Sequence, residues 1–442
     1  MNGAALGWSG IVRLGLVQAA LGSVVVLMTS TLNRVMVVEL ALPALLPGLL
    51  VALHYAVQVA RPRMGHGSDV GGRRTPWILG GIALLATGGV LAALATVWAE
   101  TQRVPGLALA FAAFVMIGLG VSAAGTSLLV LLAKRVEPER RAAAATIVWL
   151  MMIAGFALTA GIAGRLLDPY SPARLLAVVA CVCALAVIVA VIALYRLEGD
   201  ATAEPAAAAE PPKTPFTVAL RQVWAEPAAR RFTVFVFVSM LAYSAQDLIL
   251  EPFAGVAFGY TPGESTQLAG VQHGGVLLGM LLAAAAGRRR WGSLRAWTVG
   301  GCCASALALA GLVAAGFVGV GWPLAATVFL LGAANGAFSI AAIGSMMRLA
   351  GEGRERREGV RMGLWGAAQA IAFGAGGLLG AVASDVARLF IEPAPLAYAA
   401  VFAGEALLFV AAAVLATRIG RDAVQPARAP AGRPWTPGLE AR

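Results

Sequence analysis

Residues 64–76 read MGHGSDVGGRRTP and form a short polar stretch between two long apolar runs. Its glycines, among them Gly65 and Gly72, permit a tight turn. Asp69 can accept hydrogen bonds from helix N-termini or arginine side chains, and Arg73 and Arg74 favour the cytoplasmic side of a membrane. The stretch therefore predicts a cytoplasmic turn that joins two membrane-spanning helices.

The composition of the whole chain agrees with this interpretation. Of 442 residues, 60% are hydrophobic and only 12% are charged, whereas soluble domains carry about 25% charged residues. The apolar runs are continuous rather than alternating, which predicts helices and not a barrel. Because a span needs about 20 apolar residues, we expect an all-α integral membrane protein of about twelve transmembrane helices. The predicted spans are residues 11–37, 43–60, 77–98, 105–132, 142–164, 173–195, 232–255, 266–286, 295–318, 323–347, 361–387 and 396–417.

The basic residues predict the orientation of these spans. Of the 33 Lys and Arg residues, 28 fall at the amino end, in the loops after even-numbered spans and in the tail. The other five are Arg34, Arg103, Arg165, Arg174 and Arg388. Since positive charge collects on the cytoplasmic side, both termini are predicted to be cytoplasmic. The net charge of +11 then reflects topology and not nucleic-acid binding.

One long polar stretch divides the chain into two equal sets of six spans. Residues 197–216 contain an Ala/Pro run that is typical of a flexible linker. We therefore predict an N-terminal six-helix half (1–196), a cytoplasmic linker (197–231) and a C-terminal six-helix half (232–420). Residues 421–442 are rich in Pro and Arg, which predicts a disordered cytoplasmic tail.

In a six-plus-six arrangement, the pattern Gly65-x-x-x-Asp69-x-x-Gly72-Arg73-Arg74 resembles the signature loop of the major facilitator superfamily. The resemblance implies two six-helix halves that face each other. The equivalent loop of the second half, residues 287–290, keeps only the positive charge.

Two longer motifs resemble a narrower branch, the PucC/LhaA family. They are TLNRVMVVEL at residues 31–40 and AQDLILEPFAGVAFGYTPGESTQL at residues 245–268. The resemblance implies a factor for assembling photosynthetic light-harvesting complexes, which delivers or chaperones bacteriochlorophyll in a bacterial inner membrane. It also implies bacteriochlorophyll as transient cargo without a tightly bound cofactor, and light-harvesting antenna polypeptides and bacteriochlorophyll synthase as partners.

Polar residues inside spans are costly in lipid and mark candidate sites. Asn33 and Arg34 lie in the outer half of the first span, and Gln246, Asp247 and Glu251 lie at similar depth in the seventh. Asp247 and Glu251 are four residues apart, so they share a helix face. Because the first and seventh spans are equivalent and face each other in this fold, we predict an ion pair between Arg34 and Asp247 or Glu251. It would act either as a static clamp or as a gate or pigment contact.

Further polar side chains occur deeper in the spans. His54 and His273 occupy equivalent helices, and either neutral imidazole could contact the magnesium of a pigment or simply be a hydrogen-bonded core residue. The remaining groups are expected to join helices by hydrogen bonds: Gln58, Gln272, Asn335, Gln369 and Glu405. The four cysteines fit no zinc pattern, and no metal site is predicted.

Two other functions compete with pigment delivery. A proton-coupled transporter of small solutes needs a titratable relay, and the few acids in the spans offer little for one. The pair Asp247-x-x-x-Glu251 is similar to the acidic motifs of intramembrane prenyltransferases, but only one such motif occurs and no basic cluster lies nearby to bind a diphosphate. We therefore expect a protein that is not an enzyme.

Overall fold

The computed structural model describes residues 6–58, 73–137, 140–198, 216–289, 291–352 and 358–419. Within these ranges the regular structure is helical, without a strand. The first half comprises α1 (Trp8–Leu27), the π-helical turns η1 (Met28–Leu32) and η2 (Val35–Glu39), α2 (Leu45–Val57), α4 (Thr75–Thr101), α5 (Arg103–Arg135), α6 (Arg141–Leu167) and α7 (Pro172–Leu194). The second half comprises α8 (Phe216–Ala225), α9 (Pro227–Ala245), η5 (Gln246–Leu248), α10 (Leu250–Phe258), α11 (Pro262–Arg288), α12 (Leu294–Val318), η6 (Gly319–Gly321), α13 (Leu324–Glu352), α14 (Glu358–Phe390) and α15 (Ala394–Thr417).

The helices confirm an all-α membrane fold. Among the described residues, ten helical segments are long and apolar enough to cross a membrane, and the bent pair Pro227–Leu248 and Leu250–Phe258 brings the number to eleven if it is one span. α2 occupies the place of the predicted second span, but its 13 residues reach only about 20 Å. Residues 59–72, which would continue it, lie outside the described part of the chain.

Local sequence explains where many helices begin. Proline, which lacks an N–H, lies in the first turn of α4, α7, α9, α11 and α15. Ser171, Thr261 and Ser293 accept hydrogen bonds from backbone N–H groups of the helices that they precede. Along each helix, some apolar side chains pack in the protein core and others face the lipid.

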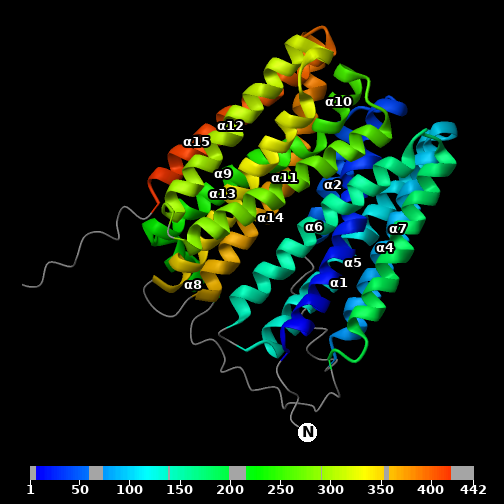
Figure 1. Cartoon of the computed structure of the whole chain (residues 1–442). Coiled ribbons are helices and arrows are strands. Elements are labelled where there is room, and N and C mark those ends of the chain that lie inside the picture. Colours follow the sequence, from blue (N-terminus) through cyan, green and yellow to red (C-terminus); the bar gives the residue numbers. More distant parts are fainter. Residues whose placement is uncertain are drawn as a thin grey trace, which may run out of the picture.

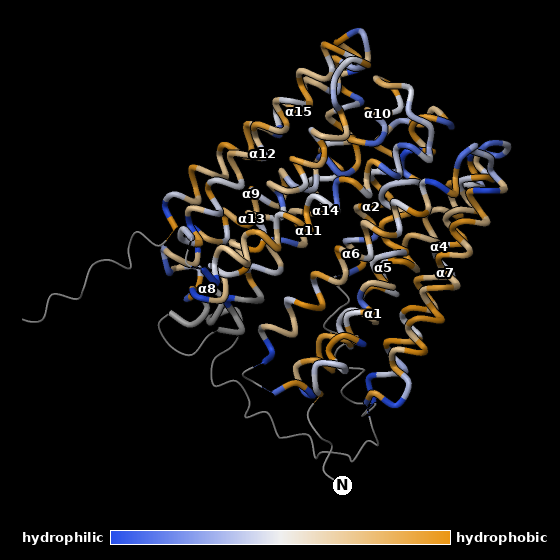
Figure 2. The backbone as a smooth tube through the Cα atoms, in the orientation of Figure 1, coloured by the Kyte–Doolittle hydropathy of each residue, from blue (hydrophilic) through white to orange (hydrophobic). Residues whose placement is uncertain are grey.

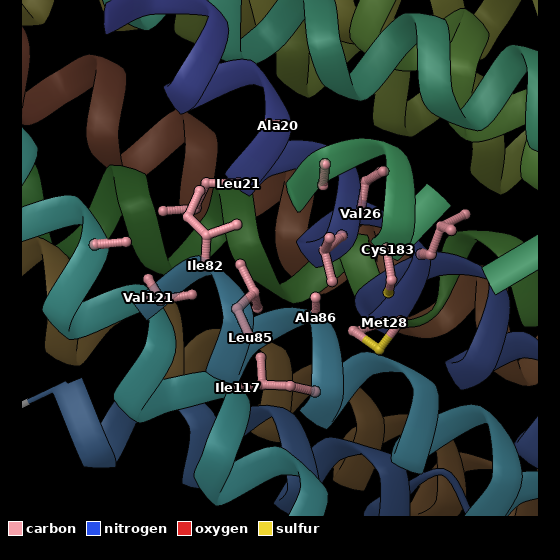
Figure 3. Packing of buried hydrophobic residues seen from close by; sticks show 14 of the residues in the cluster. Ala20, Leu21, Val26, Met28, Ile82, Leu85, Ala86, Ile117, Val121 and Cys183 are labelled. Carbon is pink, nitrogen blue, oxygen red and sulfur yellow. The ribbon is translucent and has the colours of Figure 1, made fainter. Parts of the chain in front are cut away.

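The buried apolar residues form two large clusters, one for each half. The first extends from Leu6 to Leu197 and adds Leu248 and Ala269, whereas the second extends from Val223 to Ile419. Figure 3 shows part of the first, where Leu21, Ile82 and Val121 come from three different helices. Apolar residues also dominate along the helices, while hydrophilic ones gather toward their ends (Figure 2).

Part of the segment predicted as a linker is helical. Residues Phe216–Ala225 form α8, and α9 already begins at Pro227, before the predicted start of the seventh span at 232. Val223 of α8 is fully buried in the second cluster, so burial of this side chain helps to keep the segment helical. Residues 199–215 and 420–442, which include most of the predicted flexible linker and the tail, lie outside the described ranges.

The two ends of the bundle differ in structure. We call the end at which α1 begins the basic end, and the end at which α10 finishes the far end. The two groups of helices converge at the far end and lie farther apart toward the basic end (Figure 1). At the basic end, hydrogen-bonded contacts join helices of one half, as between Arg361 and Glu226 or between Arg13 and Ala193.

Candidate functional site

The first span loses regular α-helical geometry at the far end. Two π-helical turns, Met28–Leu32 and Val35–Glu39, follow α1, with Asn33 and Arg34 between them. A π turn widens the helix and redirects its side chains, and such turns are frequent at functional sites. Asn33 and Arg34 are both buried, and each makes a contact with the opposite half.

The seventh span breaks at the same depth by a different route. The axis bends by 40° between η5 and α10. Pro252 explains the break, because its ring has no N–H and collides with the carbonyl four residues earlier, which is that of Leu248. Asn33 of the first span donates to this freed Leu248 carbonyl at 2.7 Å. The break therefore creates an acceptor that the opposite half uses.

Arg34 lies between the halves, but its ion pair differs from the predicted one. Its Nη1 donates to Glu39 Oε1 at 2.7 Å, and its Nη2 donates to the Tyr260 carbonyl at 2.7 Å. A Cβ on Gly255 would lie 2.9 Å from the guanidinium, so a larger residue there would make the Arg34 side chain shift. The predicted bridge to Asp247 or Glu251 is thus corrected. The π turn η2 brings Glu39 of the same span to the guanidinium, and the bond across the halves goes to a backbone carbonyl.

A third contact joins the same elements. The hydroxyls of Thr31 and Thr266 lie 2.9 Å apart and are both buried. We define the seam as Thr31, Asn33 and Arg34 of the first half together with Leu248, Tyr260 and Thr266 of the second.

Several buried polar atoms beside the seam have no hydrogen-bond partner. They are both amide atoms of Gln246, Oε2 of Glu251 and both carboxyl oxygens of Glu405. Ser30, Arg34 and Ser265 surround Glu251, and Gln272 lies beside Asp247. Glu251 also lies in the first turn of α10, where the helix dipole favours a negative charge. Unpartnered groups of this kind are unusual in native interiors and are typical of places where a protein binds water, an ion or a ligand.

The two candidate histidines have separate surroundings. Gln58 donates to His54 Nε2 at 3.0 Å, and the His54 ring packs on Tyr55. His273 donates from Nδ1 to the Ala269 carbonyl at 2.8 Å, which leaves the lone pair of a neutral ring on Nε2. Its ring also contacts Phe156 of the opposite half edge-on. No described contact brings the two histidines together.

The other polar groups in the spans have mixed roles. Asn335 joins two helices as predicted, because its Oδ1 accepts from Ser305 of α12 at 2.8 Å. Gln58 instead bonds within its own helix, to His54. Gln369 of α14 joins two helices as well, because its Nε2 donates to the Met240 sulfur of α9 at 4.0 Å. Glu405 lies close enough to Asp247 for their charges to interact.

Only part of the predicted signature loop can be placed. Gly65, Asp69 and Gly72 lie outside the described residues, while Arg73 is exposed at the basic end. The N–H groups of Arg74 and Thr75 donate to the Glu198 carboxylate at 2.6 and 2.8 Å. Burial alone would raise the pKa of Glu198, but these hydrogen bonds and the nearby Arg74 charge outweigh it, so its pKa is lowered. Glu198 thus caps α4, a role that the sequence analysis missed.

The sequence also matches a known protein family. The family model described as "PUCC protein" matches residues 31–424. The chain belongs to the PUCC family. The match confirms the resemblance seen in residues 31–40 and 245–268, and the structure brings these two motifs together, because together they contain every residue of the seam.

Individual relatives of this PUCC-family protein carry related names. It is 55% identical to the "Bacteriochlorophyll synthase 44.5 kDa chain" of Rhodobacter capsulatus, with 94% of this chain and 96% of that protein covered. It is 31% identical to "Protein PucC" of Cereibacter sphaeroides, with 82% and 81% covered. These similarities identify a photosynthesis-related membrane protein.

Solved structures with the same fold are transporters. A peptide transporter POT in complex with sulfate covers 95% of this chain and 97% of its own, with a TM-score of 0.69 and 15% identity. A bacterial homologue of the lysosomal transporter Spinster, in an inward-facing and unoccupied conformation, covers 92% and 95%, with a TM-score of 0.65 and 16% identity. At such low identity the likeness shows only the fold, which is that of the major facilitator superfamily.

Some seam residues escaped the sequence analysis. The Leu248 and Tyr260 carbonyls are backbone groups, and nothing in their side chains marks them. Pro252 was the available signal, because a proline inside an apolar run frees the carbonyl four residues before it. Glu39 was overlooked because it follows the predicted end of the first span at residue 37, whereas the π-helical turn η2 continues to it.

Proposed function

We propose that this protein is a non-enzymatic factor for assembling photosynthetic light-harvesting complexes, which delivers or chaperones bacteriochlorophyll within the membrane. The observation that carries the proposal is the family match over residues 31–424 together with 55% identity to a protein named for bacteriochlorophyll. The two-halved fold, shared with carriers, adds support because a carrier binds its cargo between the halves.

The seam supplies a means of holding one side of the bundle shut around such a cargo. Its bonds come from a hydroxyl pair, an amide and one arginine whose charge is matched by Glu39. A site with matched charges suits an apolar cargo, because it offers little net charge to a soluble ion. We propose that the seam opens and closes during delivery.

We further propose His273 as the better of the two histidines for contacting the pigment magnesium. Its Nδ1 donates to the Ala269 carbonyl, so Nε2 keeps the lone pair that a metal needs. His54 is less suited, because its Nε2 accepts from Gln58. His273 also contacts Phe156 of the opposite half, which places it between the halves where a cargo would lie.

The proposal can be tested by deleting the gene in its photosynthetic host. We expect weaker near-infrared antenna absorption with chemically complete bacteriochlorophyll still extractable. Complementation with His273→Gln is expected to restore less antenna than His54→Gln does, at equal amounts of folded protein. Unchanged antenna bands in a strain without related genes would contradict the assembly role.

A proton-coupled transporter of small solutes is the second candidate. The unpartnered carboxyl oxygens of Glu251 and Glu405 favour it, because buried carboxyl groups can carry protons through a transport cycle. Purified protein in vesicles would then show solute uptake that depends on a proton gradient. Glu405→Gln would abolish that uptake.

The name of the 55% identical relative requires a test for enzymatic activity as well. Our proposal expects that the purified chain does not attach a prenyl group to a bacteriochlorophyll precursor. Product formation by this chain alone, and accumulation of the unprenylated precursor in the deletion strain, would replace the assembly role with a biosynthetic one.

We also propose that the basic end faces the cytoplasm of a bacterial inner membrane. The basic residues Arg13, Arg135 and Arg196 lie there, because Leu6 just before α1 donates to the Arg135 carbonyl and Arg13 donates to the carbonyl of Tyr195, next to Arg196. Phosphatase fusions to either terminus should therefore be inactive, and a fusion in the loop after Leu167 should be active. Antenna polypeptides and bacteriochlorophyll synthase are the partners to seek by copurification in mild detergent.

A further inference from the structure

An aspartate of the second half caps the start of α2 in the first half. Asp385, near the end of α14, accepts from the N–H of Ala44 at 3.0 Å and from the N–H of Leu45 at 2.8 Å. Each carboxylate oxygen thus satisfies one of the backbone donors that every helix start leaves without a partner. The negative charge also lies where the dipole of α2 favours it.

A second aspartate makes the reverse contact. Asp168, directly after α6 of the first half, accepts from the Thr261 hydroxyl at 2.7 Å. Thr261 is the N-cap residue of α11 in the second half. A Cβ on Gly263, in the first turn of α11, would lie 2.4 Å from the Asp168 carboxylate. The carboxylate therefore lies against the start of α11, and a residue other than glycine would push it away.

The two contacts are equivalent under the twofold relation of the halves. α6 and α14 are the fifth spans of their halves, and α2 and α11 are the second spans. In both cases the far end of a fifth span carries an aspartate that meets the first turn of the second span of the other half. Such repetition is not expected of incidental surface contacts.

We propose that Asp168 and Asp385 form a pair of far-end latches, which hold the halves closed at this end and release together when it opens. The latches act on backbone N–H groups, a hydroxyl and helix dipoles, so they need no partner charge on the other half. The inference concerns the conformational cycle and does not depend on the identity of the cargo.

The exposure of the two aspartates would also let the far end open again. Charges near a helix start contribute about 0.3–1 kcal/mol at exposed sites, and both aspartates are only half-buried. Both carboxylates can therefore return to water when the halves separate, at a cost far below that of exposing a deeply buried ion.

Distance measurements between spin labels test the latches in the full-length chain. Val104 and Val320 are 80% and 79% exposed and lie at the far end of the first and second halves. Labels at Val104→Cys and Val320→Cys, with the four native cysteines changed to serine, report separation of the halves. We expect Asp168→Asn and Asp385→Asn each to raise the ratio of open to closed molecules about two- to fivefold, and the double variant about four- to twentyfold.

Two further variants make the test specific. Glu264→Gln is the matched control, because Glu264 caps its own helix by accepting from the Thr261 N–H and should leave the distance distribution unchanged. Gly263→Ala keeps both carboxylates but displaces Asp168, so it should open the far end as Asp168→Asn does. If the double variant does not fold, Gly263→Ala and the single variants decide the outcome. An unchanged distribution in folded Gly263→Ala and both single variants would overturn the proposal.

Discussion

The first and seventh spans occupy equivalent places in the two halves, yet they lose helical regularity in opposite ways. The first widens into two π turns and places donors, Asn33 and Arg34, toward the other half. The seventh breaks at Pro252 and offers backbone carbonyls, while its own Gln246 and Glu251 keep unpartnered atoms. The first span therefore holds the two halves together, whereas the seventh span keeps unpartnered polar atoms that can bind a ligand or an ion.

The largest expected effect comes from the counterion of Arg34. Arg34 is 3% exposed and Glu39 is 35% exposed, so Glu39→Leu leaves a deeply buried charge whereas Arg34→Leu leaves a carboxylate that can reach water. We expect Glu39→Leu to lower the free energy of unfolding by about 3–5 kcal/mol and Arg34→Leu by about 1–3 kcal/mol. Denaturant unfolding in detergent measures both.

Combining the two substitutions tests whether the uncompensated charge causes the loss of stability. Arg34→Leu combined with Glu39→Leu should recover much of the loss, because no charge is left buried alone. A loss below about 1 kcal/mol for Glu39→Leu would mean that Glu251 serves as counterion. The seventh span would then also clamp the halves, and the contrast between the two spans would disappear.

The second prediction tests whether Pro252 creates the acceptor for Asn33. Asn33→Leu leaves the Leu248 carbonyl buried without a donor and should cost about 1–3 kcal/mol. Pro252→Ala restores an N–H that can bond this carbonyl within the helix. Asn33→Leu should therefore cost about 1 kcal/mol less in the Pro252→Ala background. Equal costs in both backgrounds would show that the proline does not control the contact.

The third prediction concerns the spare polar capacity of the seventh span. Gln246 is fully buried with both amide atoms unpartnered. Gln246→Leu should therefore raise the free energy of unfolding of the ligand-free protein by about 1 kcal/mol. The same change should reduce antenna assembly in a complemented deletion strain, because a ligand contact is lost. Asn335→Leu is the control, since it breaks the bond to Ser305 and should destabilise instead. A destabilised Gln246→Leu protein would mean that Gln246 has a structural partner.

The sequence predicted the architecture because lipid imposes strong rules. Long apolar runs must be helices, and ten helices of the described part of the chain, or eleven with the bent pair, are long and apolar enough to span a membrane. It also located the region of the seam, because Asn33, Arg34, Gln246 and Glu251 are polar residues in otherwise apolar spans. The partner of Arg34 could not be predicted, because it depends on the π turn that carries Glu39 and on the Tyr260 carbonyl.

The latch residues show a further limit of sequence reasoning. Asp168 and Asp385 lie at the ends of spans, where charged residues are ordinary and cost little. Their partners are the Ala44 and Leu45 backbone and the Thr261 hydroxyl, more than ninety residues away in the chain. Only the arrangement of the second and fifth spans across the halves brings these groups together.

The smallest expected effect belongs to the hydroxyl pair Thr31 and Thr266. The two oxygens lie 2.9 Å apart in the seam, and hydrogen bonds between membrane helices are worth about 0.6 kcal/mol on average. A double-mutant cycle with Thr31→Val and Thr266→Val, which conserve shape, isolates this coupling from the loss of each hydroxyl. We expect a coupling free energy of about 0.6 kcal/mol in unfolding experiments. Because the bond joins the halves, we expect its loss to shift the free-energy difference between the closed and open states, measured by the spin-label distances, by a similar amount toward the open state. A coupling that appears in unfolding but not in the distances would mean that the pair survives opening, which would restrict the moving part of the seam to Asn33 and Arg34.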